Sequence, residues 1–227
     1  MADSKKRVTP ENSFARVGGQ LVREFGQLWF PSACHGCGAN GQSPCAHCCD
    51  SFAEPPDEPI PVGLHDLLVV VAYDDNFRRF WMAVKNQGNR KVLRWFGEQL
   101  VEVVQHAVLQ VDVVTWAPTS SVRRRQRGFD QSQLLARQLA AVYGKRAIAT
   151  LRRHRGAPQT GRNRQERLGG VAFSARRRIE GRVLLCDDVV TTGATMAAAA
   201  RTLLDAGAEI VIGAAVARTA AVNSLLN

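Results

Sequence analysis

The chain has 227 residues, of which 45% are hydrophobic, so it is long enough to bury a core and has a globular composition. Its net charge is +10, and no run of about 18 apolar residues occurs, which excludes a membrane-spanning helix. The first thirty residues lack both an apolar core and a cleavage site of the secretory type, so we expect a cytoplasmic protein with at most peripheral membrane contact.

The positive charge is concentrated in one segment. Residues 123–182 include seventeen Lys and Arg residues and three acidic residues, so this segment carries more net positive charge than the whole chain. Such a block attracts polyanions: nucleic acid, phosphorylated metabolites or anionic lipid. Scattered charge would indicate only a solvated surface, whereas a concentrated block favours a binding role.

The N-terminal part predicts a small module. Residues 1–13 are polar and are predicted to be disordered. From Phe14 to Phe30 the apolar residues recur at helical spacing, which predicts a helix that ends before Pro31. Five of the six cysteines follow, between Cys34 and Cys49, and in a cytoplasmic protein such a cluster favours metal binding over disulfides.

The cysteines form two Cys-x2-Cys pairs separated by seven residues. This spacing is typical of a zinc knuckle, in which four thiolates hold Zn²⁺ tetrahedrally and leave no open position, as in structural sites. Cys49, His35 or His47 is an alternative for one ligand, and free reduced thiols are the competing interpretation. The preferred Zn²⁺ ligands are Cys34, Cys37, Cys45 and Cys48.

A stretch with four prolines, residues 54–63, predicts a stiff linker between a helix and zinc-knuckle module at 14–53 and a second domain at 64–227. In the second domain, continuously apolar strands alternate with helices, which predicts an α/β fold: a parallel sheet flanked by helices on both faces. Residues 152–181 are predicted to form a long Arg-rich loop, and loops of this length are usually functional or disordered. Strands are predicted at 64–73, 111–118, 147–151, 182–186 and 209–217, and helices at 76–86, 90–107, 130–143 and 195–206.

Two adjacent acidic residues, Asp187 and Asp188, follow the apolar strand 182–186, where ligands of parallel α/β sheets bind. We predict a loop at 187–194, in which Gly193 and three threonines lead into a helix whose free N–H groups favour an anion. Because a phosphate there would be repelled by two carboxylates, we expect the acids to accept hydrogen bonds from a vicinal diol instead. A ribose 5-phosphate unit fits both the acid pair and the anion-binding loop. The competing interpretation is an aspartate that caps the helix, followed by a threonine-rich turn.

The run VLLCDDVVTTGAT resembles the signature of type I phosphoribosyltransferases, which bind 5-phosphoribosyl 1-diphosphate (PRPP). The resemblance implies that Asp187 and Asp188 hold the ribose hydroxyls and that the Thr/Gly loop holds the 5′-phosphate. The absence of GxxxxGK[ST] and GxGxxG patterns argues against P-loop and Rossmann proteins. The implied PRPP-binding residues are Asp187, Asp188, Val189, Val190, Thr191, Thr192, Gly193, Ala194 and Thr195.

Four motifs together are similar to the ComF family: the zinc knuckle, RRRQRGFDQSQLLA, QTGRNRQERLGGVAF and the PRPP loop, with AVKNQG resembling a lysine–glycine motif of that family. The resemblance covers residues 14–218 and implies a zinc module followed by a phosphoribosyltransferase-like domain, which in several members supports DNA uptake. The chain departs from the pattern at Asp130 and Gly170, where asparagine is frequent, and at WAPTS, where the strand end is usually richer in proline. We expect pyrophosphate or another anion to contact Thr119, Ser120, Arg125, Arg127 and Lys85.

Two functions follow. The first is Mg²⁺-dependent transfer of a phosphoribosyl group to an unidentified acceptor, in which Asp187 and Asp188 orient the ribose. In this reaction Arg164 and Arg167 would close over the site as a lid. The second is a non-catalytic protein that binds single-stranded DNA and is regulated by PRPP or a nucleotide. Only Phe129 and Phe173 lie within the basic segments to stack on bases.

Overall fold

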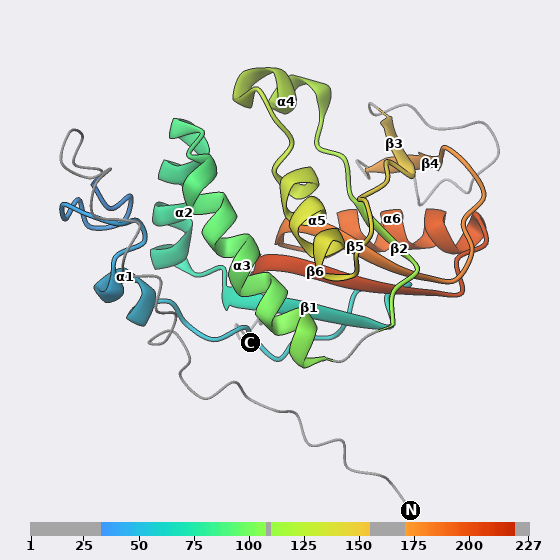
Figure 1. Cartoon of the computed structure of the whole chain (residues 1–227), viewed down its shortest axis with the longest axis horizontal. Coiled ribbons are helices and arrows are strands. Elements are labelled where there is room, and N and C mark those ends of the chain that lie inside the picture. Colours follow the sequence, from blue (N-terminus) through green and yellow to red (C-terminus); the bar gives the residue numbers. More distant parts are fainter. Residues whose placement is uncertain (1–32, 108–109, 155–170, 221–227) are drawn as a thin grey trace, which may run out of the picture. The chain divides into compact units, whose positions relative to one another are not determined.

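The computed structural model of the chain describes residues 33–107, 110–154 and 171–220 (Figure 1). The chain divides into two compact units, Met1–Ser51 and Phe52–Asn227. The helix predicted at 14–30 lies outside the described residues. The described part of the first unit contains the short helix α1 (Ala46–Asp50), which sequence analysis did not predict.

The second unit is built on a four-stranded parallel sheet. Its strand order is β1 (Asp66–Ala72), β6 (Ile210–Arg218), β5 (Arg182–Val190), β2 (Val113–Trp116). Every neighbouring pair is parallel, so the carboxyl ends of all four strands lie at the same edge. The predicted α/β fold is confirmed.

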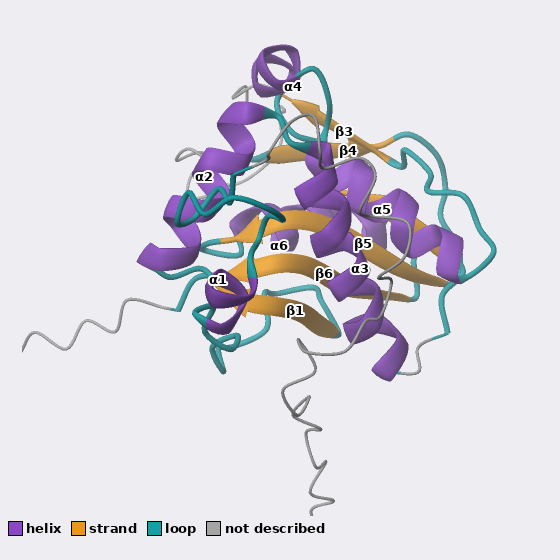
Figure 2. Cartoon of the chain, turned by 60° about the vertical axis from the view of Figure 1, so that its left-hand side comes forward, coloured by secondary structure: helices purple, strands orange, loops and turns teal. Residues whose placement is uncertain are grey.

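Helices cover both faces of this sheet (Figure 2). Helices α3 (Arg90–His106) and α5 (Gln131–Val142) pack on one face, and α6 (Ala194–Asp205) packs on the other. Strand β5 contributes side chains to the hydrophobic clusters on both faces of the sheet, because successive side chains of a strand point to opposite faces. Leu184 and the fully buried Cys186 join the α3/α5 cluster, whereas Val183 and Leu185 join the α6 cluster.

Helix α2 (Asp75–Gln87) is fixed by an aromatic cluster. The ring of Phe77 stacks on Trp81 with centroids 5.5 Å apart, and Phe96 of α3 meets both rings edge-on. Phe52, the first residue of the second unit, packs edge-on against Phe77 at 5.1 Å. Such pairs contribute about 0.5–1.5 kcal/mol each beyond the area they bury, so α2 has a firm position.

The proline-rich stretch 54–63 lies within the second unit and is tied to the sheet. Arg218, at the end of β6, donates to the carbonyl oxygens of Glu58 and Pro59. The backbone N–H of Ala72 donates to the carbonyl oxygen of Ala53. These bonds explain why the prolines, which predict a linker from composition alone, are part of the folded unit.

Three segments differ from the sequence prediction. Arg123 to Arg127 belong to a short helix, α4 (Ser121–Arg127), which is not among the predicted helices. The region predicted as one long loop contains an antiparallel hairpin of β3 (Leu151–His154) and β4 (Ala172–Ala175). Of residues 147–151, predicted as a strand, Leu151 begins β3 and Ala147 makes an isolated bridge to Val114, while the Thr115 hydroxyl donates to the carbonyl oxygen of Ile148. Among the described helices, none is long and apolar enough to cross a bilayer.

Candidate functional site: an acid pair beside an anion-binding loop

The acid pair lies in the last part of β5, not in the loop that the sequence predicted. Pairing with β6 continues through Val190, which aligns with Arg218, so the loop is limited to residues 191–193. The prediction failed here because acidic residues are rare in strands, whereas pairing with a buried neighbouring strand overrides that preference. The extension holds the backbone of both acids rigidly at the carboxyl edge of the sheet.

Asp187 is almost completely buried, with 8% of its surface exposed. Its Oδ1 atom accepts a hydrogen bond from the Ser132 hydroxyl at 2.9 Å and one from the Asp188 backbone N–H at 2.8 Å. Burial and the neighbouring carboxylate of Asp188 raise the pKa of Asp187 to about 8. Its surroundings therefore favour the protonated form of this carboxyl group.

Asp188 has the opposite character. Its Oδ2 atom lies 2.6 Å from the Lys85 ammonium on α2, and its Oδ1 atom accepts from the Val189 N–H at 2.9 Å. Burial acts to raise the pKa of Asp188, but the Lys85 ammonium together with hydrogen bonds from Val189 and Asp187 outweighs it and holds that pKa below the ordinary value. The pKa values of the two acids are thus shifted in opposite directions. Lys85, which sequence analysis predicted to contact an anion, forms an ion pair with Asp188.

A third buried acid, Asp130, organises the segment after β2. It caps α5 by accepting from the Gln133 N–H, and it also accepts from the Thr119 N–H at 3.0 Å. Burial raises the pKa of Asp130 despite these bonds. Thr119 and Ser120, predicted as anion contacts, are partly exposed beyond the end of β2. Sequence analysis missed the roles of Asp130 and Ser132, although an Asp followed three residues later by Gln is a recognisable capping pattern.

The loop after β5 has the form of an anion site. Gly193 precedes α6 with φ of 73°, and Thr191 and Thr192 are exposed. The first N–H groups of a twelve-residue helix and its dipole face this loop, and both favour negative charge. On the other side of Gly193, a Cβ atom would lie 2.9 Å from Cγ of Pro61. Pro61, in the proline-rich stretch, therefore packs against the loop at Gly193.

Replacing Gly193 by alanine is expected to lower the free energy of unfolding by about 2–5 kcal/mol. About 1–2 kcal/mol comes from the left-handed backbone conformation, and about 1–3 kcal/mol comes from overlap with Pro61. Gly128→Ala is the matched control, because Gly128 has the same φ of 73° and nothing within 4 Å of an added Cβ. Urea unfolding of both variants measures the difference. Equal losses would show that Pro61 does not constrain the loop.

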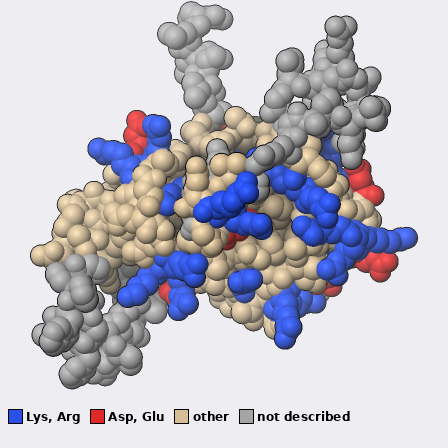
Figure 3. Space-filling model, turned by 90° about the horizontal axis from the view of Figure 1, so that it is seen from above, with Lys and Arg blue, Asp and Glu red and all other residues tan. Residues whose placement is uncertain are grey.

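Basic side chains surround this edge of the sheet. Figure 3 shows Lys and Arg predominating over Asp and Glu on the face that carries α4. Arg124 and Arg125 of α4 are exposed, whereas the side chain of Arg127 and the whole of Arg164 and Arg167 lie outside the described residues. The electrostatic character of this face suits a polyanionic ligand.

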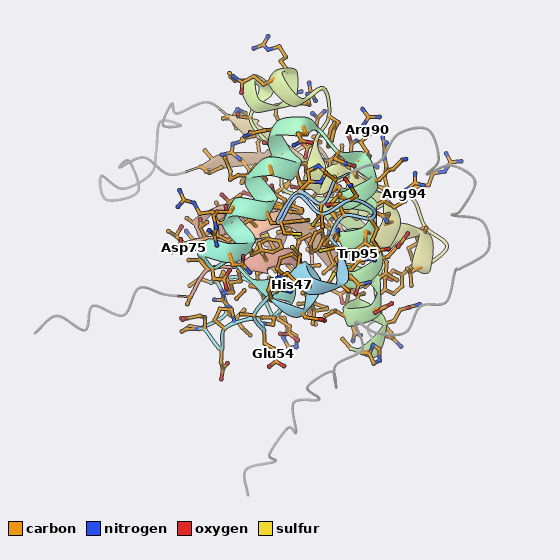
Figure 4. All side chains as sticks on the ribbon, turned by 90° about the vertical axis from the view of Figure 1, so that its left-hand side faces the viewer. His47, Glu54, Asp75, Arg90, Arg94 and Trp95 are labelled. Atoms are coloured by element: carbon orange, nitrogen blue, oxygen red, sulfur yellow. The ribbon has the colours of Figure 1, made fainter. Side chains whose placement is uncertain are left out.

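Two separate sequence motifs meet beside Lys85. Arg90, the first residue of α3 (Figure 4), places its guanidinium over the ring of Phe129, 4.9 Å from the centroid. Gly88, which ends α2 with φ of 62°, lies against the same ring. The AVKNQG and RRRQRGFD segments thus meet at the Phe129 ring, where Gly88 ends the helix that carries Lys85, and Arg90, two residues further along the chain, adds a cation–π contact to that ring.

The four predicted zinc ligands gather in the first unit. The sulfur atoms of Cys34, Cys37, Cys45 and Cys48 all lie within 4.8 Å of one another. The Cys34–Cys48 and Cys37–Cys45 distances are 3.6 and 3.5 Å, close to the roughly 3.8 Å edge of a tetrahedron with Zn–S bonds of about 2.3 Å. This is the one group of three or more metal-ligating side chains found among the described residues.

Local structure shapes the knuckle. The N–H of Cys34 donates to the carbonyl of Ala39, and Gly38 turns the chain with φ of 77°. His35 bonds to Ser43 through its ring Nδ1 at 2.8 Å, and neither it, His47 nor Cys49 belongs to the sulfur cluster. Burial and the neighbouring sulfurs raise the pKa of Cys48, because four thiolates repel one another. A divalent cation relieves that repulsion, so the donor set fits zinc.

Comparison with known proteins agrees with this geometry. Residues 126–223 match the family model described as the phosphoribosyl transferase domain. No curated protein matches the chain. The matched residues include α5, β5 with the acid pair, the loop, α6 and β6, and they exclude the cysteine cluster and α2. Residues 126–223 are therefore similar to a phosphoribosyl transferase domain in both sequence and fold.

Proposed function

We propose that the second unit binds PRPP and transfers its phosphoribosyl group to an acceptor. The observation that carries the proposal is the adjacency of a buried acid pair and an anion-binding loop at one end of β5, in a domain of phosphoribosyltransferase type. A phosphate at the start of α6 places a ribose beside Asp187 and Asp188. The two carboxyl groups then accept hydrogen bonds from its 2′- and 3′-hydroxyls.

In the proposed reaction the bond from C1 of the ribose to the diphosphate oxygen breaks, and a bond from the acceptor to C1 forms. The diphosphate leaves with both electrons of the broken bond. Thr119, Ser120 and the exposed arginines of α4 stabilise the negative charge that it takes away. We assign closure over the site to Arg164 and Arg167.

Mg²⁺ belongs to the same proposal. When bound, it neutralises charge on the departing diphosphate. The cysteine cluster is the one group of metal-ligating side chains among the described residues, and thiolates suit zinc rather than magnesium. Mg²⁺ usually keeps several waters and binds through phosphate oxygens, so we propose that it enters with PRPP.

The finer assignments also belong to the proposal: membership of the ComF family, a helix and zinc-knuckle module at 14–53, a link to DNA uptake, and a cytoplasmic location. The competing function is binding of single-stranded DNA without catalysis. The exposed arginines of α4 and of the hairpin, including Arg125 and Arg152, favour it. Binding of this type weakens steeply as salt rises.

Calorimetry with Mg-PRPP, followed by measurement of pyrophosphate release with a panel of nucleobases, tests the proposal. We expect saturable binding and base-dependent pyrophosphate release. Binding without release, together with salt-sensitive binding of an oligonucleotide, would favour the DNA-binding function. Failure to bind Mg-PRPP at all would contradict the transferase and would leave a nucleotide as the regulator in the DNA-binding function.

A further inference from the structure

The pair of acids beside an anion site presents an electrostatic problem. Two carboxylates next to the loop at 191–193 would repel the phosphate that the loop favours. The structure contains a third charged group at this point: the ammonium of Lys85, 2.6 Å from Asp188. Both side chains of this ion pair are largely buried, with 12% and 18% of their surfaces exposed, so solvent screens the interaction weakly.

The position of Lys85 is fixed by its contact with Trp81 and by the packing of α2. Its ammonium lies 5.7 Å from the centroid of the Trp81 ring, one helical turn earlier on α2. Trp81 is fully buried and stacks on Phe77. Beyond Lys85, the helix ends at Gly88 against Phe129. A surface lysine would sample many rotamers, whereas this one is packed against a fixed aromatic surface and directed to Asp188.

Asp187 completes the cluster. Ser132 and the Asp188 backbone supply two hydrogen bonds to its Oδ1 atom, and 8% of its surface is exposed. The lysine pairs with Asp188 rather than with Asp187. The single positive charge of Lys85 can balance one negative charge. The two adjacent carboxyl groups are therefore most stable when one is ionised and the other keeps its proton. The direction of both pKa shifts agrees with this distribution.

We propose that Lys85 is a positioning residue of the ribose site: together Lys85, Asp188 and Asp187 form a cluster with one shared proton and no net charge, which an anionic sugar phosphate can approach without repulsion. This inference rests on the proposed assignment of the acid pair to a ribose. It differs from a direct role of Lys85 in binding pyrophosphate, because the lysine acts through Asp188.

Other titratable groups face the cluster from neighbouring elements. Asp130, before α5, and Tyr73, after β1, both interact electrostatically with Asp188. Asp130 also interacts with Arg124, and Tyr73 with Arg78; both of these arginines are exposed. Cys186 precedes the pair and is fully buried, and burial raises the pKa of its thiol. Among the described residues, Lys85 is the cation that forms an ion pair with the acids, so its removal should dominate any change.

Carbon-13 NMR of the free protein, with aspartate labelled at the side-chain carboxyl carbon, tests the cluster directly. Asp187→Asn and Asp188→Asn variants assign the two signals. We expect the wild-type pair to keep one proton at pH 7 and to lose it near pH 8. In Lys85→Met the lower ionisation step of the pair should rise by about 1–3 pH units, because the opposite charge that favours the carboxylate is gone.

Two variants serve as controls. Lys85→Arg keeps the charge and should keep the lower step, and Arg79→Met removes an exposed charge from the same helix and should leave it unchanged. If Lys85→Met does not fold, Lys85→Met/Asp188→Asn removes both partners, and its Asp187 carboxyl should still be protonated at pH 7. Ionisation of both wild-type carboxyls at pH 7, or equal shifts in Lys85→Met and Arg79→Met, would overturn the cluster.

Calorimetry with Mg-PRPP at pH 7 separates this inference from the proposed function. We expect Lys85→Met to weaken binding by about tenfold or more and Lys85→Arg to restore most of it. Wild-type protein that does not bind Mg-PRPP would overturn the proposed function and with it the role of the cluster. Wild-type protein that binds it but shows two ionised carboxyls at pH 7 would overturn the cluster alone.

Discussion

Replacement of Asp188 by asparagine is expected to abolish the thermal stabilisation that Mg-PRPP gives to the wild-type protein. A ligand at 100 times its Kd stabilises a folded protein by about 2.7 kcal/mol, which corresponds to a rise of about 5–10 °C in Tm for a chain of this size. Asparagine presents an N–H₂ group or a weaker acceptor to the diol and leaves Lys85 without its carboxylate. Differential scanning fluorimetry with and without Mg-PRPP measures the effect.

Glu209→Gln is the matched control for this experiment. Glu209 is exposed and precedes β6, at the amino edge of the sheet, so the same change from acid to amide falls far from the proposed site. We expect this variant to keep the full rise in Tm. Circular dichroism should show that free Asp188→Asn remains folded. A normal rise in Tm for Asp188→Asn would remove this residue from the ribose site.

Replacement of Cys34 and Cys37 by serine is expected to remove the metal from the first unit. Purified wild-type protein should contain about one Zn²⁺ per chain, because four thiolates close a tetrahedral site. Structural zinc contributes about 10–16 kcal/mol to the folding of zinc-finger peptides, so loss of two ligands should unfold this unit as well. Elemental analysis by mass spectrometry measures the zinc, and limited proteolysis monitors the unit.

Cys49→Ser distinguishes the ligand set. Cys49 is buried beside the four clustered cysteines in sequence, but its sulfur does not belong to the group that can share a metal. We therefore expect Cys49→Ser to retain zinc. Loss of zinc in this variant would show that Cys49 replaces one of the four. Native protein without zinc would reject the site altogether.

The sequence predicts the parallel sheet and the Thr/Gly loop because both depend on local pattern. The apolar runs around Leu184 and Val211 can be buried on two faces, and the Thr/Gly loop leads directly into a helix. The partner of Asp188 could not be predicted in the same way. Lys85 lies about a hundred positions earlier in the chain, and its place depends on how the aromatic cluster around Trp81 packs α2.

The end of β5 and the proline-rich stretch show a related limit. From composition, the prolines at 54–63 predict a linker, and Asp187 and Asp188 predict a loop. In the structure, pairing between Val190 and Arg218 extends strand β5 past both acids. The same Arg218 then binds the carbonyls of Glu58 and Pro59. Both errors have one cause: hydrogen bonds from a neighbouring strand satisfy the backbone in ways that local propensity does not encode.

The contact of Pro61 with Gly193 bears on how this protein can be shortened. A chain that starts at residue 64, the boundary suggested by composition, would lose the ring that lies behind the loop and the carbonyls that bind Arg218. A chain that starts at Phe52 would keep them and also keep the ring that packs on Phe77. In descendants that lose the cysteine module, selection should therefore preserve the proline-rich stretch.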